Sequence, residues 1–387
     1  MSIDIARLRK RFPALVHKHY LNSGSYGLLS LDVKRAFEEY LACRDERGSD
    51  WGEWAMRDDS VRTRMARLLN ASADEIAITT SASAGINSLV TALDFSGPRS
   101  KVVVSDFEFP TSGQIWHAQE LRGARIEHVP EAANGYIPLE HFERAIDENT
   151  RVVAIAQVCY RNGARLDVEE IVRIAHRKGA LVLLDCFQAV GALGIDVKAL
   201  DVDFAVGGML KYLLGTAGIG FLYCRRELIE SLVPTVTGWF AQANPHDMDI
   251  YHNVPARTAR RFQAGTPPVP NCYAAAAGLD IILELGIGEI ERRIRALTGT
   301  CMDRLLEAGC TLATPREDAH RGPSVCIQAA DDNALVAKLA ERNIVTSCRA
   351  GNVRATFHCY NDDADIDALV STVVTNRDLL RRPSNRD

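Results

Sequence analysis

The chain has 387 residues, which leaves room for two domains and a large buried core. Hydrophobic residues make up 47% and charged residues 25%, which is typical of globular proteins and excludes disordered, collagen-like and coiled-coil chains. A formal net charge of −5 gives no general basic surface for nucleic acid or an anionic membrane. No apolar run approaches the ~18 residues that span a bilayer.

The ten cysteines form no C-x-x-C pair and lie mostly within apolar runs, as small buried hydrophobic residues do. This usage indicates reduced thiols and argues against a zinc site or a disulfide framework. The N-terminal residues lack the apolar region of a signal peptide. We therefore expect a cytoplasmic protein without a metal centre.

The first predicted elements are two helices, at 30–45 with Ser30 as the cap and at 57–69. From residue 75 to 224, short β-branched runs alternate with helical patterns, which indicates a parallel sheet with crossover helices. The predicted strands are 76–79, 101–105, 124–129, 151–158, 180–185, 202–206 and 220–224, and the helices between them are 83–93, 112–122, 138–146 and 168–178. We predict a doubly wound α/β domain with seven mostly parallel strands.

The pattern changes after residue 270. Long helices at 271–308 precede a strand at 324–328, a helix at 333–342, short strands near Val345 and Val353, and a helix from Ala364. This βαββα order indicates a smaller α+β domain. We therefore assign 1–270 to a large domain, with an N-terminal arm over about 1–29, and 271–387 to a small C-terminal domain.

Asp185 closes the apolar run 180–184, at the strand end where open parallel sheets bind their ligands. A carboxylate in this position either contacts a ligand or caps the following helix, and both interpretations stay open. Gln188 follows three residues later and faces the same site in either case.

Only eight residues are lysines, and Lys211 alone lies among glycines and apolar residues, in segment 205–220. Burying an ammonium group without a partner is costly, whereas a neutral amine or a Schiff base suits such a setting. The alternative is a structural lysine whose stem packs on apolar surface while its amine reaches solvent.

Segment 79–85, TTSASAG, is a turn of small residues between a strand and a helix. It presents backbone N–H groups and the hydroxyls of Ser81 and Ser83 at a helix N-terminus, where proteins commonly bind phosphate. Ser83 as a simple helix cap is the alternative.

Together, a phosphate turn, a strand-end aspartate and a lysine 26 residues later resemble the fold type I enzymes that use pyridoxal 5'-phosphate. The similarity is greatest to the class V aminotransferase superfamily, which includes cysteine desulfurases, kynureninases and isopenicillin N epimerase-like proteins. Besides the lysine segment, the resembling segments are 20–27 (YLNSGSYG), 107–112 (FEFPTS), 184–191 (LDCFQAVG), 237–239 (TGW), 261–267 (RFQAGTP) and 351–361 (GNVRATFHCYN).

The resemblance implies catalytic and substrate-binding roles. Lys211 would bind the cofactor covalently and then take the Cα proton of the substrate, while Asp185 would keep the pyridine nitrogen protonated. Arg354 would bind the substrate α-carboxylate, for which a bidentate guanidinium is suited. Asn22 and Ser23, in the N-terminal arm, would also contribute to the substrate pocket.

The resemblance also implies cofactor contacts. Gln188 would donate to the ring 3'-oxygen and Phe109 would stack on the ring, while Thr266 would reach the phosphate of a neighbouring subunit and so imply a homodimer with a shared active site. The other implied cofactor-binding residues are Ser81, Ala82 and Ser83 at the phosphate, and Trp239. Structural roles remain alternatives for several of these residues: Phe109 in the core, Gln188 at a helix start, Thr266 in a turn and Arg354 on a surface strand.

Two departures from the family pattern bear on the reaction. Leu210 precedes the lysine where many members have histidine and kynureninases have tyrosine, and Ser112 stands where kynureninases usually show aspartate. Desulfurases carry a nucleophilic cysteine on a mobile loop, and the short interval from Cys348 to Arg354 leaves no room for such a loop.

The resemblance implies an enzyme that deprotonates Cα of an L-amino acid. We expect a β-eliminating lyase acting on a carbon–sulfur or similar bond, with aminotransferase as the second candidate and amino-acid epimerase as the third. A catalytically idle binding module of the same fold is the non-enzymatic alternative, and the joint presence of Lys211, Asp185 and Arg354 argues against it.

Overall fold

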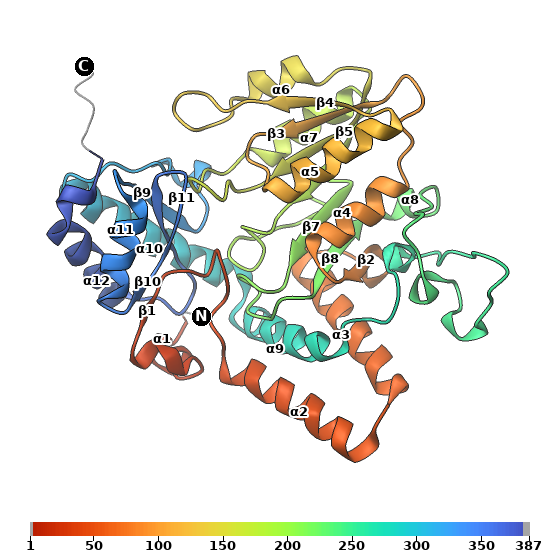
Figure 1. Cartoon of the computed structure of the whole chain (residues 1–387), viewed down its shortest axis with the longest axis horizontal. Helices are drawn as coiled ribbons and strands as arrows, with labels where there is room; N and C mark the ends of the chain where they lie inside the picture. The colour runs from red at the N-terminus through yellow and green to blue at the C-terminus, as the bar shows by residue number, and fades with distance from the viewer. Residues whose placement is uncertain (1–2, 382–387) are drawn as a thin grey trace.

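A seven-stranded sheet forms the centre of the larger part of the chain in the computed structural model, which describes residues 3–381 (Figure 1). Its strand order is β2-β8-β7-β6-β5-β3-β4, and every neighbouring pair is parallel except those that include β8. The strands are β2 (Ile76–Thr79), β3 (Lys101–Ser105), β4 (Arg125–Val129), β5 (Thr150–Ala156), β6 (Leu181–Asp185), β7 (Phe204–Gly208) and β8 (Gly220–Cys224). All seven predicted strands are present, and the predicted α/β class is confirmed.

Helices cover both faces of this sheet because alternate residues of its buried strands point to opposite sides. One face packs against α4 (Ala82–Thr91) and α5 (Pro110–Ala118), through side chains such as Leu89 and Trp116. The other packs against α3 (Trp51–Leu69), α6 (Leu139–Ala145), α7 (Val168–Arg177) and α9 (Val269–Leu285). Helix α2 (Leu31–Arg47) begins after its cap Ser30, as predicted, and lies along α9.

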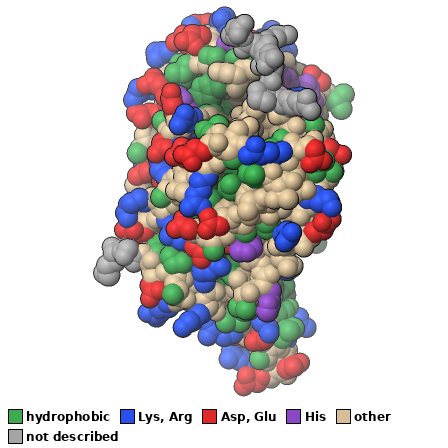
Figure 2. Space-filling model, turned by 90° about the vertical axis from the view of Figure 1, so that its left-hand side faces the viewer, with side chains coloured by type: hydrophobic (Ala, Val, Ile, Leu, Met, Phe, Trp, Pro, Cys, Tyr) green, Lys and Arg blue, Asp and Glu red, His purple; other side chains and the backbone are tan. Residues whose placement is uncertain are grey.

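The C-terminal part contains a second, antiparallel sheet in the order β11-β12-β9, formed by Ser347–Arg349, Asn352–Thr356 and Ser324–Gln328. Its core includes residues from α10 (Ile287–Glu307), α11 (Asp332–Ala340) and α12 (Asp363–Thr375). Figure 2 views the molecule from this side, and its charged side chains of both signs are interspersed rather than segregated.

The N-terminal arm, which we predicted to belong to the large domain, also pairs with the C-terminal part. After α1 (Ile5–Arg9), strand β1 (His19–Tyr20) pairs in parallel with β10 (Ile344–Val345) of the C-terminal part. In contrast, α9 contributes Cys272 and Leu279 to the core of the large sheet. The division into 1–270 and 271–387 therefore stays a prediction, while the arm bridges both parts.

Several helices begin or end a few residues away from their predicted boundaries. Helix α3 begins six residues before the predicted start because Asp50 caps it by accepting from the Glu53 N–H. The predicted 271–308 helical stretch is two helices, broken at Gly286, whose positive φ of 81° favours glycine. Within the described residues, no helix is long and apolar enough to cross a membrane.

Candidate active site

A cavity of about 220 Å³ opens at the carboxyl ends of the parallel strands. Asp185 enters it from the end of β6, Lys211 from the turn after β7, and Phe109 from the start of α5. Parallel strands of one sheet end at the same edge, so residues far apart along the chain converge here. The cavity wall also contains Ser81, Ala82, Ser83 and Gln188.

Lys211 has no hydrogen bond or ion pair with any residue in the described range 3–381. Its Nζ instead lies 4.1 Å from the centroid of the Phe187 ring and 5.9 Å from that of Phe109. Burial lowers the pKa of Lys211 from 10.5 to about 8; Asp185 opposes this shift, and the positive charge of Arg354 adds to it. The result is a buried amine that loses its proton around pH 8, well below the ordinary 10.5 of a lysine.

Phe187 owes its position to Gly208, at the end of β7. A Cβ at residue 208 would lie 2.4 Å from the tip of the Phe187 ring, so a side chain there would displace the ring. Only glycine therefore lets this aromatic face lie beside the amine of Lys211.

Asp185 makes one local hydrogen bond, accepting from the Phe187 N–H at 2.8 Å. No helix follows it, so the interpretation as a helix cap is wrong. Burial raises the pKa of Asp185, while that N–H and Lys211 counteract the shift. Its carboxylate is thus available to a positively charged group in the cavity.

Glu108, which the sequence analysis missed, is a second acid beside Asp185. Its Oε1 is buried and has no hydrogen-bond partner among residues 3–381. Burial and the neighbouring charge of Asp185 raise the pKa of Glu108 well above its ordinary value. Two adjacent carboxyl groups do not both ionise readily, and we assign the proton to Glu108 because it is the acid without a cation beside it.

The turn before α4 is built to receive an anion. Ser81 is the helix cap, with its Oγ accepting from the Ala84 N–H at 3.0 Å, so the expectation that Ser83 might cap the helix is wrong. The N–H groups of Ala82 and Ser83 belong to the first helical turn, where they lack intrahelical partners. Gly220 permits close packing of β8 here, because a Cβ there would lie 2.9 Å from the Ala82 nitrogen.

Arg354, on β12, is buried next to the cavity rather than on the surface. Its Nη1 donates to the Tyr160 carbonyl at 2.6 Å, and its Nη2 donates to the hydroxyls of Ser347 at 2.9 Å and Ser25 at 3.1 Å. Its Nε is buried and has no partner in the part of the chain that the structure describes. These three contacts fix the guanidinium and leave two of its five N–H groups, one on Nε and one on Nη1, for further acceptors.

The arm loop 22–26 lies between this arginine and Gln188. Gln188 Nε2 donates to the Gly24 carbonyl at 3.1 Å, and the Gly24 N–H donates to Thr356 Oγ1 at 2.8 Å. Asn22 has a buried Oδ1 without a partner, whereas Ser23 is fully buried with its hydroxyl 2.5 Å from the Tyr360 hydroxyl. Ser23 thus stabilises the loop from the interior.

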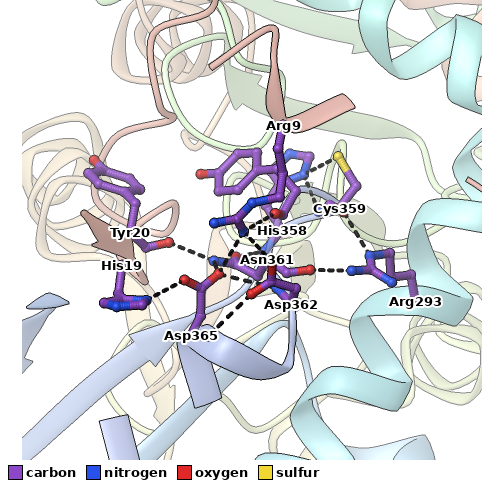
Figure 3. Close-up of polar contacts among 10 residues, drawn as sticks. Arg9, His19, Tyr20, Arg293, His358, Cys359, Asn361, Asp362 and Asp365 are labelled. Carbon is purple, nitrogen blue, oxygen red and sulfur yellow. Dashed lines mark hydrogen bonds and ion pairs between the residues drawn. The ribbon is translucent and has the colours of Figure 1, made fainter. Parts of the chain in front are cut away.

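A polar network holds the arm in place (Figure 3). Buried Asp365 accepts from His19 at 2.8 Å, from Arg9 at 3.2 Å and from Asn361 at 2.9 Å. His358 extends the network to the active site, because its Nδ1 accepts from the Cys359 N–H at 2.7 Å and its Nε2 therefore donates to the Tyr212 carbonyl at 2.9 Å. The arm is thus linked to the residue after Lys211.

Two predicted cofactor residues lie outside the cavity of this single chain. Trp239 lines another cavity, of about 600 Å³, together with Trp51 and Phe240. Thr266 is exposed in the turn before α9. Their predicted roles, which for Thr266 involve a second subunit, are not tested by one chain and stay predictions.

The family description Aminotransferase class-V matches residues 50–369. The chain belongs to this family. It is 31% identical to the uncharacterized aminotransferase YcbU of Bacillus subtilis, over 91% of this chain and 93% of the relative.

Other relatives in the family carry different names. A kynureninase of Deinococcus radiodurans is 31% identical over 86% of this chain and 81% of its own length. The cysteine desulfurase of Thermococcus onnurineus NA1 superimposes with a TM-score of 0.87 at 24% identity, covering 97% of this chain and 98% of that structure. This class V member is therefore a fold type I enzyme that depends on pyridoxal 5'-phosphate, as the resemblance implied.

The residues present suit this cofactor. The unpartnered amine of Lys211 can bind its aldehyde carbon, Asp185 can pair with its ring nitrogen, and the free N–H groups of Ala82 and Ser83 can bind its phosphate. Phe109, which is 47% exposed, forms the outer wall of the cavity, and Phe187 forms a wall beside Lys211.

Proposed function

We propose that this class V enzyme is a β-eliminating lyase acting on an L-amino acid whose β-carbon carries sulfur or a similar leaving group. The observation that carries the proposal is the amine of Lys211, which is buried, has no hydrogen-bond partner within the described residues, and has a pKa of about 8. An amine with a pKa of about 8 has a much larger neutral fraction at pH 7 to 8 than an ordinary lysine, and it is therefore suited to take a proton from Cα.

The other residues prepare that step. Pyridoxal 5'-phosphate, when bound, withdraws electrons from Cα and makes its proton acidic. Ser81, Ala82 and Ser83 hold the phosphate, and Asp185 keeps the ring nitrogen protonated. Arg354 binds the α-carboxylate of the substrate through its free Nε, which turns Cα towards Lys211.

Two observations disfavour the reactions named for the relatives. Strands β11 and β12 are joined by Ala350 and Gly351 alone, which leaves no loop to carry a nucleophile, and Cys348 donates to Asn333 at 3.4 Å. Burial and Asp332 raise the pKa of Cys348, which suppresses its thiolate. Leu210, in the cavity wall before Lys211, offers no acid for kynureninase chemistry.

Transamination is the second candidate, favoured by the 31% identity to a protein named as an aminotransferase. Product analysis separates the two reactions. We expect the holoenzyme to convert S-alkyl-L-cysteines or β-chloro-L-alanine to pyruvate and ammonia without an added 2-oxo acid. Strict dependence on a 2-oxo acid acceptor would instead establish transamination and refute the lyase proposal.

We further propose a homodimer in which Thr266 completes the phosphate site of the neighbouring subunit. In support, exposed apolar side chains gather near Trp239, in the segment that follows α8 (Arg226–Ile229) and extends away from the sheet in Figure 1. In that segment they are Met248, Ile250, Tyr251 and Val254, and Trp51 at the start of α3 packs against Trp239. Light scattering of the wild type tests for the dimer, and Thr266→Ala should weaken cofactor binding while leaving the dimer intact.

A cytoplasmic location is also proposed. All ten cysteines are free thiols and eight of them are buried, which is typical of proteins in a reducing compartment. Fractionation of the source cells, with detection by a specific antibody, tests this location directly.

A further inference from the structure

Tyr160 lies in the turn after β5, and its main chain is held rigidly at the cavity. The Cys159 N–H donates to the Ala164 carbonyl at 2.8 Å, and the Gly163 N–H donates to the Cys159 carbonyl at 2.9 Å, which closes the turn. The carbonyl of Tyr160 accepts from Arg354 at 2.6 Å. The backbone of Tyr160 is therefore fixed beside the group that binds the substrate carboxylate.

The side chain of Tyr160 lines the same cavity as Lys211 and Asp185. Its ring packs edge-on against Phe109, with 5.1 Å between centroids and 70° between planes. Its hydroxyl makes no hydrogen bond with any residue in the range 3–381, unlike Tyr20, which donates to the Tyr26 carbonyl, and Tyr360, which pairs with Ser23. The ring is positioned and the hydroxyl is free.

Elimination of a thiolate is assisted by a proton donor when the carbon–sulfur bond breaks as Lys211 takes the Cα proton, and a group other than Lys211 then has to donate. Lys211 accepts the Cα proton, and Asp185 holds the cofactor nitrogen. The remaining donors in the cavity wall are the hydroxyls of serine and threonine, the amide of Gln188 and the phenol of Tyr160. A phenol is a far stronger acid than an alcohol or an amide, so Tyr160 is the best acid of this set.

We propose that Tyr160 is a catalytic residue that donates its hydroxyl proton to the departing β-substituent. This inference rests on the proposed lyase function. The Cα–H bond breaks with its proton passing to Lys211, and its electron pair forms the Cα–Cβ double bond. The bond from Cβ to the substituent breaks with its electron pair on the substituent, which takes the Tyr160 proton. Water then returns the proton from Lys211 to Tyr160, and no redox partner is needed.

The proposal predicts a dependence on the leaving group. Chloride departs as a stable anion and needs no proton, whereas an alkyl thiolate is a stronger base and gains from protonation as the bond breaks. The test compares holoenzymes of the wild type and Tyr160→Phe with β-chloro-L-alanine and S-ethyl-L-cysteine. Phenylalanine keeps the ring contact with Phe109 and removes only the hydroxyl.

We expect Tyr160→Phe to lose at least about tenfold in kcat for S-ethyl-L-cysteine, and on the order of 100-fold if general-acid catalysis is fully developed. The kcat for β-chloro-L-alanine should fall by less than about twofold, because no proton is transferred to its leaving group. Cofactor affinity, measured by fluorescence titration of cofactor-free protein, should be unchanged. The control Tyr136→Phe, a partly buried tyrosine outside the cavity, should match wild type with both substrates.

Each other outcome has a defined meaning. Equal losses with the two substrates, or no loss with S-ethyl-L-cysteine, would overturn the role of Tyr160 while leaving the lyase function standing. Weakened cofactor binding in Tyr160→Phe would assign it a structural role in the cofactor site and also overturn the proposal. If the wild type releases pyruvate from neither substrate, the lyase function itself falls, and the proposed role of Tyr160 falls with it.

Discussion

The amine nitrogen of Lys211 lies 4.1 Å from the centroid of the Phe187 ring. The ring shields the amine from water, and burial is the largest cause of the lowered Lys211 pKa, about 8. Phe187→Ala opens space beside Gly208 and admits water to the amine. We therefore expect the pKa of Lys211 to rise from about 8 towards 10.5 in this variant.

Cofactor binding to the cofactor-free protein measures this shift, because only a neutral amine attacks an aldehyde. The rate constant for covalent binding of pyridoxal 5'-phosphate, followed by absorbance, should rise through about pH 8 in the wild type and at a higher pH in Phe187→Ala. Phe187→Leu keeps most of the apolar bulk and should stay close to wild type. Identical pH profiles for all three proteins would show that Phe187 does not control this pKa.

Glu108 and Asp185 are neighbouring acids with opposite expected protonation states. Asp185→Asn removes the charge that stabilises a protonated ring nitrogen, and kcat should fall on the order of 100-fold, as when one electrostatic contact to a transition state is lost. Glu108→Gln mimics the neutral acid and should keep kcat within about twofold. A comparable loss in both variants would show that Glu108 is ionised in the active enzyme.

The same variant has a predicted pH dependence of stability. The pKa of Glu108 in the folded protein lies above its ordinary 4.5. The contribution of this carboxyl group to the free energy of unfolding is therefore largest below about pH 4.5, and it decreases as pH rises towards the folded-state pKa. Glutamine does not titrate. In urea unfolding, the free energy of unfolding of Glu108→Gln should therefore rise relative to that of the wild type between pH 5 and pH 8. A difference between the two proteins that does not change with pH would contradict a protonated Glu108.

The sequence was sufficient for the features that depend on local patterns. Buried β-branched runs predicted every strand of the large sheet. The strand-end position of Asp185 and the glycine-rich setting of Lys211 marked these two residues as site candidates, and both line the cavity. Contacts set by strand order were not visible in the sequence. Glu108 lies between two phenylalanines in the sequence, and only the strand order, which places β3 and β6 on either side of β5, brings it to Asp185.

Short elements were also beyond local patterns. Strand β1 has only two residues, too few for a periodic pattern, and both its partner β10 and Asp365, which contacts His19, lie more than 300 residues away in the sequence. Phe187 and Tyr160 resemble ordinary core residues in the sequence. They acquire functional significance because Gly208 clears space for one ring and Arg354 fixes the backbone of the other.

His358 should make stability depend on pH in the acid range. Burial lowers the pKa of His358 from 6.5 to about 4, so the unfolded chain binds a proton in this interval and the folded chain does not. Stability should therefore fall as pH drops from about 6.5 to about 4, by up to about 3 kcal/mol from this residue. His358→Gln should lack this component when both proteins are unfolded in urea at pH 4.5 and pH 7.

The same substitution tests the link to the active site, because the Nε2 of His358 donates to the carbonyl after Lys211. A glutamine that fails to restore this bond should lower kcat with little change in cofactor content. Asp367→Asn, which removes an exposed ion pair with Arg304, is a control that should change neither the pH dependence nor kcat. If the free energy of unfolding falls equally between pH 7 and pH 4.5 in His358→Gln and in the wild type, the titrating group is not His358.

Arg354 should control substrate binding without controlling the cofactor. Among the described residues its Nε has no partner and Nη1 uses one of its two N–H groups for the Tyr160 carbonyl, while Nη2 is held by Ser25 and Ser347. Lysine cannot reproduce this planar arrangement, so Arg354→Lys should raise KM on the order of 100-fold, about 3 kcal/mol, with a smaller change in kcat. Ser347→Ala removes one hydrogen bond to the guanidinium and should raise KM about tenfold or less. The absorbance band of lysine-bound cofactor should persist in both variants, and its loss in Arg354→Lys would show that this arginine binds the cofactor instead of the substrate carboxylate.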